Sequence, residues 1–346
     1  MQKEKKYFAS ANTENGFVSY FDEIYGSLDM VYIIKGGPGT GKSSFIRKIA
    51  DEAEKRRYSV EYFYCSADPL SLDGIIVEEL KTAVVDGTAP HNYDPKIAGI
   101  RERIINLGDN WDNAKLRLQT DLICRLTAEK NNMYNNVYNY LSAAGRIEGE
   151  IRLGNKKMID REKMENAVRR ISRQWKKGSG FAKIIRPVES LSHAGHIIYS
   201  TYHAMAENRY SIRDKYGIGG VFLEYVMNIC FEKGMKVVYS PRSVDPTENV
   251  ALYLPDVSTS FVVDDHLSDE CKVINMDRFI DFEMLRNQKN RNRFARRCLD
   301  SLYEGVQSGF DNIFELHSRL EKCYIESMDF SKNERILSNL KREIFL

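Results

Sequence analysis

A glycine-rich stretch near the amino terminus, residues 36–43, has the residue types and spacing of a phosphate-binding loop. It reads GGPGTGKS and satisfies the pattern G-x-x-x-x-G-K-[ST]. In such a loop, glycines let backbone N–H groups turn toward phosphate oxygens, and the following helix N-terminus adds partial positive charge. Lys42 would reach the β- and γ-phosphates, and the Ser43 hydroxyl would bind Mg²⁺. The predicted nucleotide-binding residues are Gly37, Pro38, Gly39, Thr40, Gly41, Lys42, Ser43 and Ser44.

The residues on either side of this loop favour the strand, loop, helix order that the chemistry requires. Residues 31–34 are a short apolar run of β-favouring types. After the loop, Phe45, Ile46 and Ile49 recur at helical spacing. The alternative is a glycine-rich turn that merely joins a strand to a helix. The flanking pattern makes a phosphate-binding loop the favoured interpretation.

Two aspartates that follow predicted strands are candidates for the chemistry. Residues 82–86 form an apolar run ending in Asp86, which we predict to be a metal ligand, although an Asp-Gly pair is also a common turn. Residues 60–65 form another predicted strand, and Asp68 follows it. Asp68 would orient water or a second substrate, or alternatively cap a helix. The catalytic candidates are Lys42, Asp86 and Asp68, with Glu79 as a further candidate for activating water.

The sequence around these motifs resembles a family of uncharacterised bacterial ATPases with tandem P-loop domains. The resemblance rests on KGGPGTGKSSFIRKIA, CSADPLSLDG, VVDGTAPH and IINLGDNWD, and it extends to YFASANTENGF and HSRLEKCYIESMDF. It implies ATP binding, ATP hydrolysis and two related halves, but no particular pathway. His91, in the DGTAPH motif, is a candidate for sensing phosphate. A loop histidine hydrogen-bonded to backbone is the alternative.

Three sequence matches indicate an internal repeat, as the resemblance implies. They occur in the same order along both halves, at offsets of 178, 177 and 169 residues. The matches are Val262-Val263-Asp264 with Val84-Val85-Asp86, Asp245-Pro246 with Asp68-Pro69, and Val273 to Met276 with Ile104 to Leu107.

The repeat predicts a degenerate second loop. At an offset of 178, Gly220 stands in place of Lys42 and Val221 in place of Ser43. Without a lysine and a hydroxyl, such a loop lacks its γ-phosphate contact and its metal ligand. A coincidental glycine-rich turn is the alternative. His266 would correspond to the histidine of the DGTAPH motif.

The predicted fold class is α/β, with two P-loop NTPase-like domains. Each would have a mainly parallel sheet flanked by helices, with an added helical hairpin. The segments 113–176 and from Asp281 onward have helical patterns and would form these hairpins, which pack on the molecule itself or bind a protein partner. KKGSGFAK, residues 176–183, is the best linker candidate. The predicted domains are residues 1–177, which bind the nucleotide, and residues 178–346, which are degenerate.

Composition excludes several classes of protein. Lys plus Arg number 51 against 49 Asp plus Glu, so the net charge of +2 gives no reason to expect a polyanionic partner. The basic run 289–297, KNRNRFARR, fits a solvated helix face better than a contact to nucleic acid or to a γ-phosphate. No membrane span, secretory signal or zinc-like cysteine spacing is present, which predicts a cytoplasmic protein.

The leading functional hypothesis is a Mg²⁺-dependent ATPase. Its first half would bind and hydrolyse ATP, and its second half would be structural or regulatory. The predicted cofactors are ATP and Mg²⁺, and the helical arms are the candidate surface for a protein partner. A small-molecule phosphotransferase and a nucleotide-dependent binding switch with little turnover are the alternatives.

Overall fold

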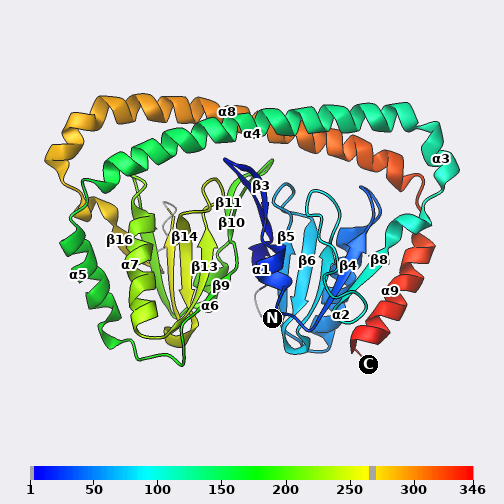
Figure 1. The fold of residues 1–346 in the computed structure, drawn as a ribbon, viewed down its shortest axis with the longest axis horizontal. Coiled ribbons are helices and arrows are strands. Elements are labelled where there is room, and N and C mark those ends of the chain that lie inside the picture. The colour runs from blue at the N-terminus through cyan, green and yellow to red at the C-terminus, as the bar shows by residue number, and fades with distance from the viewer. Residues whose placement is uncertain (1–3, 265–269, 346) are drawn as a thin grey trace.

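Two similar six-stranded sheets lie side by side in the computed structural model, which describes residues 4–264 and 270–345. Each sheet is flanked by helices, and two long helices run across both (Figure 1). The predicted α/β class is confirmed at this level. Among the described residues, no helix combines the length and the apolar character needed to cross a membrane.

The first sheet has the strand order β1-β5-β6-β7-β4-β8. β6 is antiparallel to both of its neighbours, whereas the pairs β1–β5, β4–β7 and β4–β8 are parallel. The sheet is therefore mixed, and the start of β6 lies at the edge where β4, β5 and β7 end. The strands are β1 (Lys5–Phe8), β4 (Met30–Lys35), β5 (Val60–Tyr64), β6 (Leu72–Val77), β7 (Thr82–Asp86) and β8 (Glu102–Asn106).

The second sheet repeats this order as β9-β13-β14-β15-β12-β16, again with one strand, β14, antiparallel to its neighbours. Each half also carries a two-stranded hairpin. The strands are β9 (Ala182–Ile185), β12 (Asn208–Arg213), β13 (Lys236–Pro241), β14 (Asn249–Leu254), β15 (Thr259–Val263) and β16 (Lys272–Asn275). The hairpins are β2 (Ser10–Thr13) with β3 (Gly16–Ser19), and β10 (Glu189–Ser192) with β11 (Gly195–Ile198).

Strand pairing confirms the order of the repeat and corrects one predicted match. In the first sheet Asp86 lies opposite Ile34, and in the second Val263 lies opposite Ile212. Asp264 therefore lies one residue beyond the position of Asp86. The predicted match of Asp264 to Asp86 is wrong by one residue, and an apolar side chain takes the place of the carboxylate.

The helices next to the sheets also correspond in the two halves. In α2 the residues Phe45, Ile46 and Ile49 are buried, as their helical spacing predicts. The corresponding helices are α1 (Phe21–Tyr25) and α6 (Thr201–Met205), and α2 (Lys42–Lys55) and α7 (Gly219–Glu232). The short 3₁₀ turns are η1 (Glu78–Leu80), η2 (Leu107–Asn110), η3 (Ser172–Gln174), η4 (Pro255–Val257) and η5 (Met276–Phe279).

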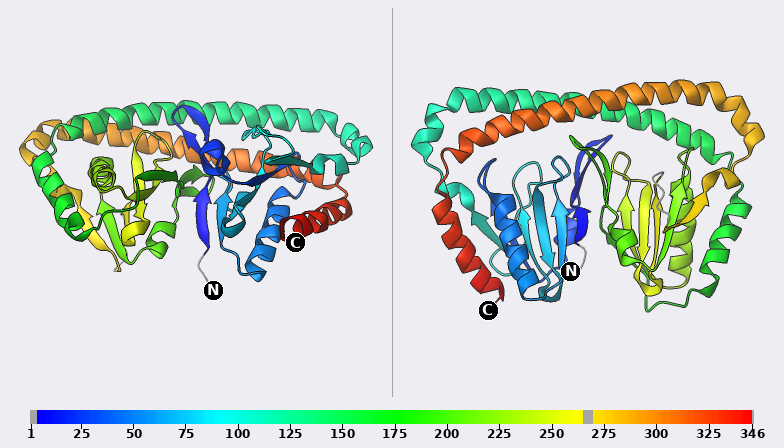
Figure 2. Two further views of the ribbon diagram at one scale, coloured as in Figure 1. Left: turned by 60° about the horizontal axis from the view of Figure 1, so that its bottom comes forward. Right: turned by 180° about the vertical axis from the view of Figure 1, so that it is seen from behind.

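The segments predicted as helical hairpins are long arms that the two halves exchange (Figure 2). After α3 (Asn113–Leu118), α4 (Thr120–Lys156) crosses to the second half, where α5 (Arg161–Ile171) packs on α7. α8 (Phe282–Ile325) crosses back, and α9 (Phe330–Phe345) packs on α2. The two crossing helices run antiparallel and pack on each other. The prediction of one hairpin on each domain is therefore wrong, because each returning helix belongs to the other half.

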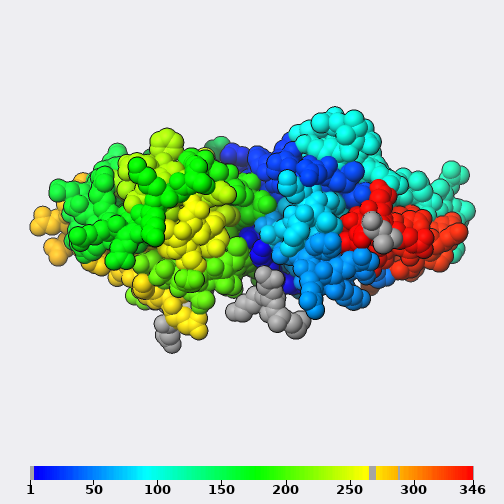
Figure 3. Space-filling model, turned by 90° about the horizontal axis from the view of Figure 1, so that it is seen from below, coloured from blue at the N-terminus to red at the C-terminus, as the bar shows by residue number. Residues whose placement is uncertain are grey.

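The halves are also joined through a shared apolar core, and they meet in the middle of the space-filling view (Figure 3). One buried cluster contains Tyr7 and Phe63 from the first half together with Val188 and Tyr202 from the second. The predicted boundary at residue 177 lies between α5 and β9. Each segment so divided contains one complete sheet, and its last α-helix packs on a helix of the other half.

Candidate functional site

The loop between β4 and α2 has the backbone conformation that its glycines permit. Gly39 and Gly41 have φ angles of +67° and +81°, in the left-handed region that favours glycine. Gly41 immediately precedes the first residue of α2. The Thr40 hydroxyl donates to the Gly37 carbonyl oxygen at 2.9 Å and closes the loop. The N-terminus of α2 therefore lies at the carboxyl edge of the sheet, with its partial positive charge facing the loop.

Lys42, the first residue of α2, folds back over this loop. Its Nζ donates to the carbonyl oxygens of Gly36 and Gly37 at 2.9 and 2.8 Å. It also lies 3.6 Å from Oδ2 of Asp86. The Lys42 and Asp86 side chains are only 12% and 15% exposed, so the pair is largely shielded from water.

Ser43 and Asp86 present oxygen atoms of the kind that Mg²⁺ prefers. Ser43 Oγ accepts a hydrogen bond from the Leu72 amide at 2.9 Å, which leaves a lone pair for a metal. Asp86 Oδ1 accepts from the Thr88 amide at 2.8 Å, while Oδ2 faces the lysine. Over the described ranges, no group of three or more His, Cys, Asp or Glu side chains is arranged to hold a metal ion. A metal here would take its remaining ligands from phosphate and water.

The structure adds Asp73, which sequence reasoning missed. It lies near the start of β6, which is antiparallel to β7 and therefore begins beside the end of that strand. Asp73 Oδ2 lies 3.1 Å from Nε2 of His91, and both side chains are buried. The imidazole ring stacks on Phe21, with the ring centroids 4.8 Å apart. The sequence Leu72-Asp73-Gly74 gave no signal for this contact, because it does not reveal the direction of β6 in the sheet.

The pKa values of this group reflect burial and close charges. Burial raises the pKa of Asp86, and the Asp73 carboxylate acts in the same direction while Lys42 opposes both. Burial lowers the pKa of His91, but the charge and hydrogen bond of Asp73 outweigh it, so the net shift is upward. The upward shift in pKa favours a protonated His91 beside Asp73.

The arms of the second half complete the site. A Cβ atom on Gly39 would lie 2.7 Å from the Glu321 carbonyl oxygen of α8. From α9, the Asn333 side-chain amide donates to the Thr40 carbonyl oxygen at 2.9 Å. Burial lowers the pKa of His317, also on α8, to about 4, and Lys42 contributes to this shift. The first site is therefore built from both halves of the chain.

Asp68 lies in the turn after β5 and faces the second half. Its Oδ1 accepts from the Leu70 amide at 3.1 Å and lies 3.6 Å from Nε2 of His193, between β10 and β11. Within the described residues it forms no hydrogen bond or ion pair with Lys42 or Asp86. Its catalytic role stays a prediction.

Glu79 is at the wrong end of the sheet for catalysis at the loop. It lies in η1, directly after β6, at the edge opposite to the glycine-rich loop. Its two carboxylate oxygens accept from the Ser59 amide at 3.0 and 2.9 Å. Glu79 therefore fixes the start of β5, and the prediction that it activates water is wrong.

The second loop is one residue shorter than the predicted alignment assumed. α2 begins at Lys42 and α7 at Gly219, an offset of 177, although the preceding strands are offset by 178. Gly219 therefore replaces Lys42, and Gly220 replaces Ser43. The predicted pairing of Gly220 and Val221 with these residues is wrong by one position, but the lysine and the hydroxyl are both missing, as predicted.

In the second loop, the Asp214 carboxylate bonds to backbone amides of the same loop. Asp214 Oδ1 accepts from the amides of Tyr216 and Ile218 at 3.2 and 3.0 Å, and Oδ2 accepts from the Gly219 amide at 2.6 Å. Backbone amides that would face a phosphate in such a loop are here bonded to a side chain of the same loop. His266, which would correspond to His91, lies outside the described residues.

The basic run of α8 lies over the second half. Arg296 Nη2 donates to the Lys215 carbonyl oxygen at 2.6 Å, and Arg291 lies 3.2 Å from a Glu150 carboxylate oxygen of α4. These contacts place the run beside the second loop. Within one chain, it does not supply an arginine to the first loop.

Comparison of the chain with protein-family models, curated proteins and solved structures found no match. The resemblance to tandem P-loop ATPases therefore stays a prediction.

Proposed function

We propose that the first half is a P-loop domain that binds ATP with Mg²⁺ and hydrolyses it, while the second half supplies structure and regulation. The observation that carries this proposal is the convergence of Lys42, Ser43 and Asp86 at one sheet edge. Lys42 Nζ lies 3.6 Å from Asp86 Oδ2, beside the N-terminus of α2. A cation, a hydroxyl and a carboxylate around a glycine-rich loop are the groups that phosphoryl transfer requires.

The chain would act mainly by positioning the nucleotide and neutralising its charge. The loop amides and Lys42 would bind the phosphate oxygens, so Lys42 would exchange its bonds to the loop carbonyls for bonds to phosphate. Ser43 and Asp86 would hold Mg²⁺, which supplies further neutralisation of the phosphates when bound. We assign the buried Asp86 carboxylate to Mg²⁺ and not to proton transfer, because a carboxylate oxygen beside the loop is a ligand that Mg²⁺ prefers.

A nucleotide-dependent switch is the second candidate function, because α8 lies directly against the loop. The close approach of the Glu321 carbonyl to Gly39 ties the loop conformation to the position of this helix. A bound γ-phosphate would bias that contact, and α8 would carry the change to the second half. The small-molecule phosphotransferase remains an alternative that differs by requiring an acceptor.

Phosphate release from ATP and from GTP, with Mg²⁺ and without an acceptor, tests the proposal. We expect release from ATP by the wild type and its loss in Lys42→Ala. Lys48→Ala is the matched control, because Lys48 lies on the same helix with its side chain 47% exposed. Equal release by Lys42→Ala would refute the proposal. Tight ATP binding without release would leave the switch or the phosphotransferase.

A further inference from the structure

A separate cavity of about 390 Å³ lies in the second half, where β13 ends. The residues after β13, the β10–β11 hairpin, α4 and α8 all contribute to its wall. The volume is in the range of small-molecule sites, and carboxyl ends of strands are where α/β sheets bind ligands. The polar residues of the wall are Arg242, Ser243, Glu189, His196, Glu148, Tyr303 and Gln307.

Arg242 is the unusual member of this wall. Its Nε is buried and has no hydrogen-bond partner among the residues that the structure describes. Glu189, Glu148 and Asp214 raise its pKa through longer-range electrostatics, without a hydrogen bond. A buried donor without an acceptor is costly, and a bound anion would supply that acceptor.

The two carboxylates of the cavity contact groups other than Arg242. Glu189 Oε1 lies 2.7 Å from Nε2 of His196, whose pKa the carboxylate raises against the opposing effect of burial. Glu148 accepts from the Tyr303 hydroxyl at 2.7 Å and lies 3.5 Å from Arg152. Neither carboxylate forms a hydrogen bond or an ion pair with Arg242, whose guanidinium is left without a direct partner among the described residues.

The first half has no such cation at the equivalent position. The Cys65 amide donates to the Ser71 carbonyl, and the Arg242 amide donates to the equivalent Glu248 carbonyl, each at the end of the corresponding strand. Arg242 therefore replaces Cys65, a thiol kept neutral because burial raises its pKa. The second half lacks the lysine of the first loop, but it has a cation of its own at a different place.

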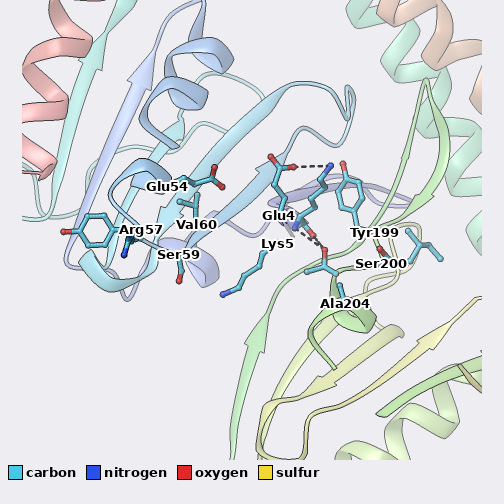
Figure 4. A pocket seen from close by; sticks show the side chains of 13 residues that line it. Glu4, Lys5, Glu54, Arg57, Ser59, Val60, Tyr199, Ser200 and Ala204 are labelled. Atoms are coloured by element: carbon cyan, nitrogen blue, oxygen red, sulfur yellow. Dashed lines mark hydrogen bonds and ion pairs between the residues drawn. The ribbon is translucent and has the colours of Figure 1, made fainter. Parts of the chain in front are cut away.

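A wider groove of about 970 Å³ makes a useful contrast (Figure 4). It lies between the halves, beside the amino ends of β1 and β5. Its lysines are paired, Lys5 with Glu78 and Lys6 with Glu4. Among the described residues that line this groove, no charged side chain is both buried and unpaired, in contrast to the Arg242 Nε of the smaller cavity.

We propose that the cavity at Arg242 binds a small organic monocarboxylate. The planar guanidinium fork matches a carboxylate, and a single negative charge is the smallest that this fork can pair with beside two glutamates. A phosphomonoester would bring up to about two negative charges beside Glu189 and Glu148. Leu191 and Val244 supply apolar contacts for the body of the ligand. The proposal does not depend on ATP hydrolysis at the first loop.

Thermal unfolding with added sodium acetate, pyruvate or benzoate tests the proposed carboxylate site. Sodium chloride and sodium phosphate at equal ionic strength are the controls. We expect at least one carboxylate to raise the melting temperature of the wild type with increasing concentration, as a ligand of the native state does. Lys42→Ala should respond equally, which separates this site from the first loop. Arg170→Gln, at an exposed arginine of α5, is the matched control and should also respond.

Arg242→Gln should lose the response. Because that variant removes a buried group, Gln307→Glu provides a second measurement, by adding a negative charge to the wall. We expect this variant to raise the dissociation constant of the carboxylate about tenfold, as measured by calorimetry. No carboxylate effect beyond that of chloride, a response that survives in Arg242→Gln, or a response to phosphate alone would each overturn the proposal.

Discussion

The two glycine-containing loops follow equivalent strands and precede equivalent helices, yet a side chain bonds to different backbone groups in each: a lysine donates to carbonyl oxygens of the first loop, and a carboxylate accepts from amides of the second. In the first, Lys42 covers the loop and pairs with Asp86. In the second, the Asp214 carboxylate accepts from the loop amides, and Gly219 stands in place of the lysine. The second half therefore keeps a loop whose backbone amides can bind an anion, and there the Asp214 carboxylate takes the place of that anion.

The crossing helices extend this difference to the surroundings of each loop. Arg152 of α4 approaches Gly217 and pairs with Asp245. At the equivalent place in the first half, α8 brings Glu321 to Gly39. A side chain of one arm thus lies beside the second loop and pairs with Asp245 after β13, whereas the other arm approaches the first loop through its backbone.

The largest expected difference concerns Asp86 and Asp264. Asp86→Asn should reduce ATP turnover about 100-fold or more, because the variant removes a metal-holding charge. Nucleotide affinity should fall much less. Asp264→Asn is the control, because strand pairing places Asp264 one residue beyond the equivalent position. Phosphate release and equilibrium ATP binding measure both effects, and an equal loss in the two variants would contradict the structural alignment.

Asp214→Ala tests the self-occupied second loop. The variant should lower the free energy of unfolding by roughly 1–3 kcal/mol, because three amides lose their acceptor. Urea unfolding measures this change, with the exposed Asp300 of α8 changed to alanine as the control. A value near zero would mean that the carboxylate does not stabilise the loop.

Gly39→Ala and Gly217→Ala form a matched pair. Both glycines have left-handed φ angles, +67° and +69°, so both variants should lose stability, by roughly 1 kcal/mol or more. A new Cβ at Gly39 would meet the Glu321 carbonyl oxygen at 2.7 Å, whereas at Gly217 it would meet the flexible Arg152 side chain at 3.0 Å. Gly39→Ala should therefore cost more in urea unfolding. Equal costs would argue against a tight contact between α8 and the first loop.

The smallest expected effect is a pH dependence at His91. Its pKa is raised above 6.5 in the folded state, so its pair with Asp73 contributes its full stabilisation of the folded protein below about pH 6.5. That stabilisation is lost as the pH rises through the folded pKa. The stability of the wild type relative to His91→Gln should therefore fall between pH 7 and pH 9.

His317→Gln is the control for this measurement. The pKa of His317 is lowered to about 4, so this residue stays neutral in the folded protein over the same pH range. Its difference from the wild type should not change between pH 7 and pH 9. A wild-type advantage over His91→Gln that is constant with pH would show that His91 is neutral at the site.

Local sequence was sufficient to predict the first loop. The apolar run before residue 36, the glycines and the helical spacing after Lys42 together specify a strand, a tight turn and a helix. The order of the repeat could also be read from short matches. The alignment failed by one residue at Asp264 and at the second loop, because only strand pairing and helix starts show where a residue is missing.

Tertiary structure decided which side chains meet. Asp73 joins His91 only because β6 is antiparallel to its neighbours, and a strand pattern does not encode its direction. The helical pattern of the arms fixed their secondary structure, but the same apolar stripe can be buried on either half. The exchange of α5 and α9, and with it the contact of Glu321 with the first loop, depends on packing between residues far apart in the chain.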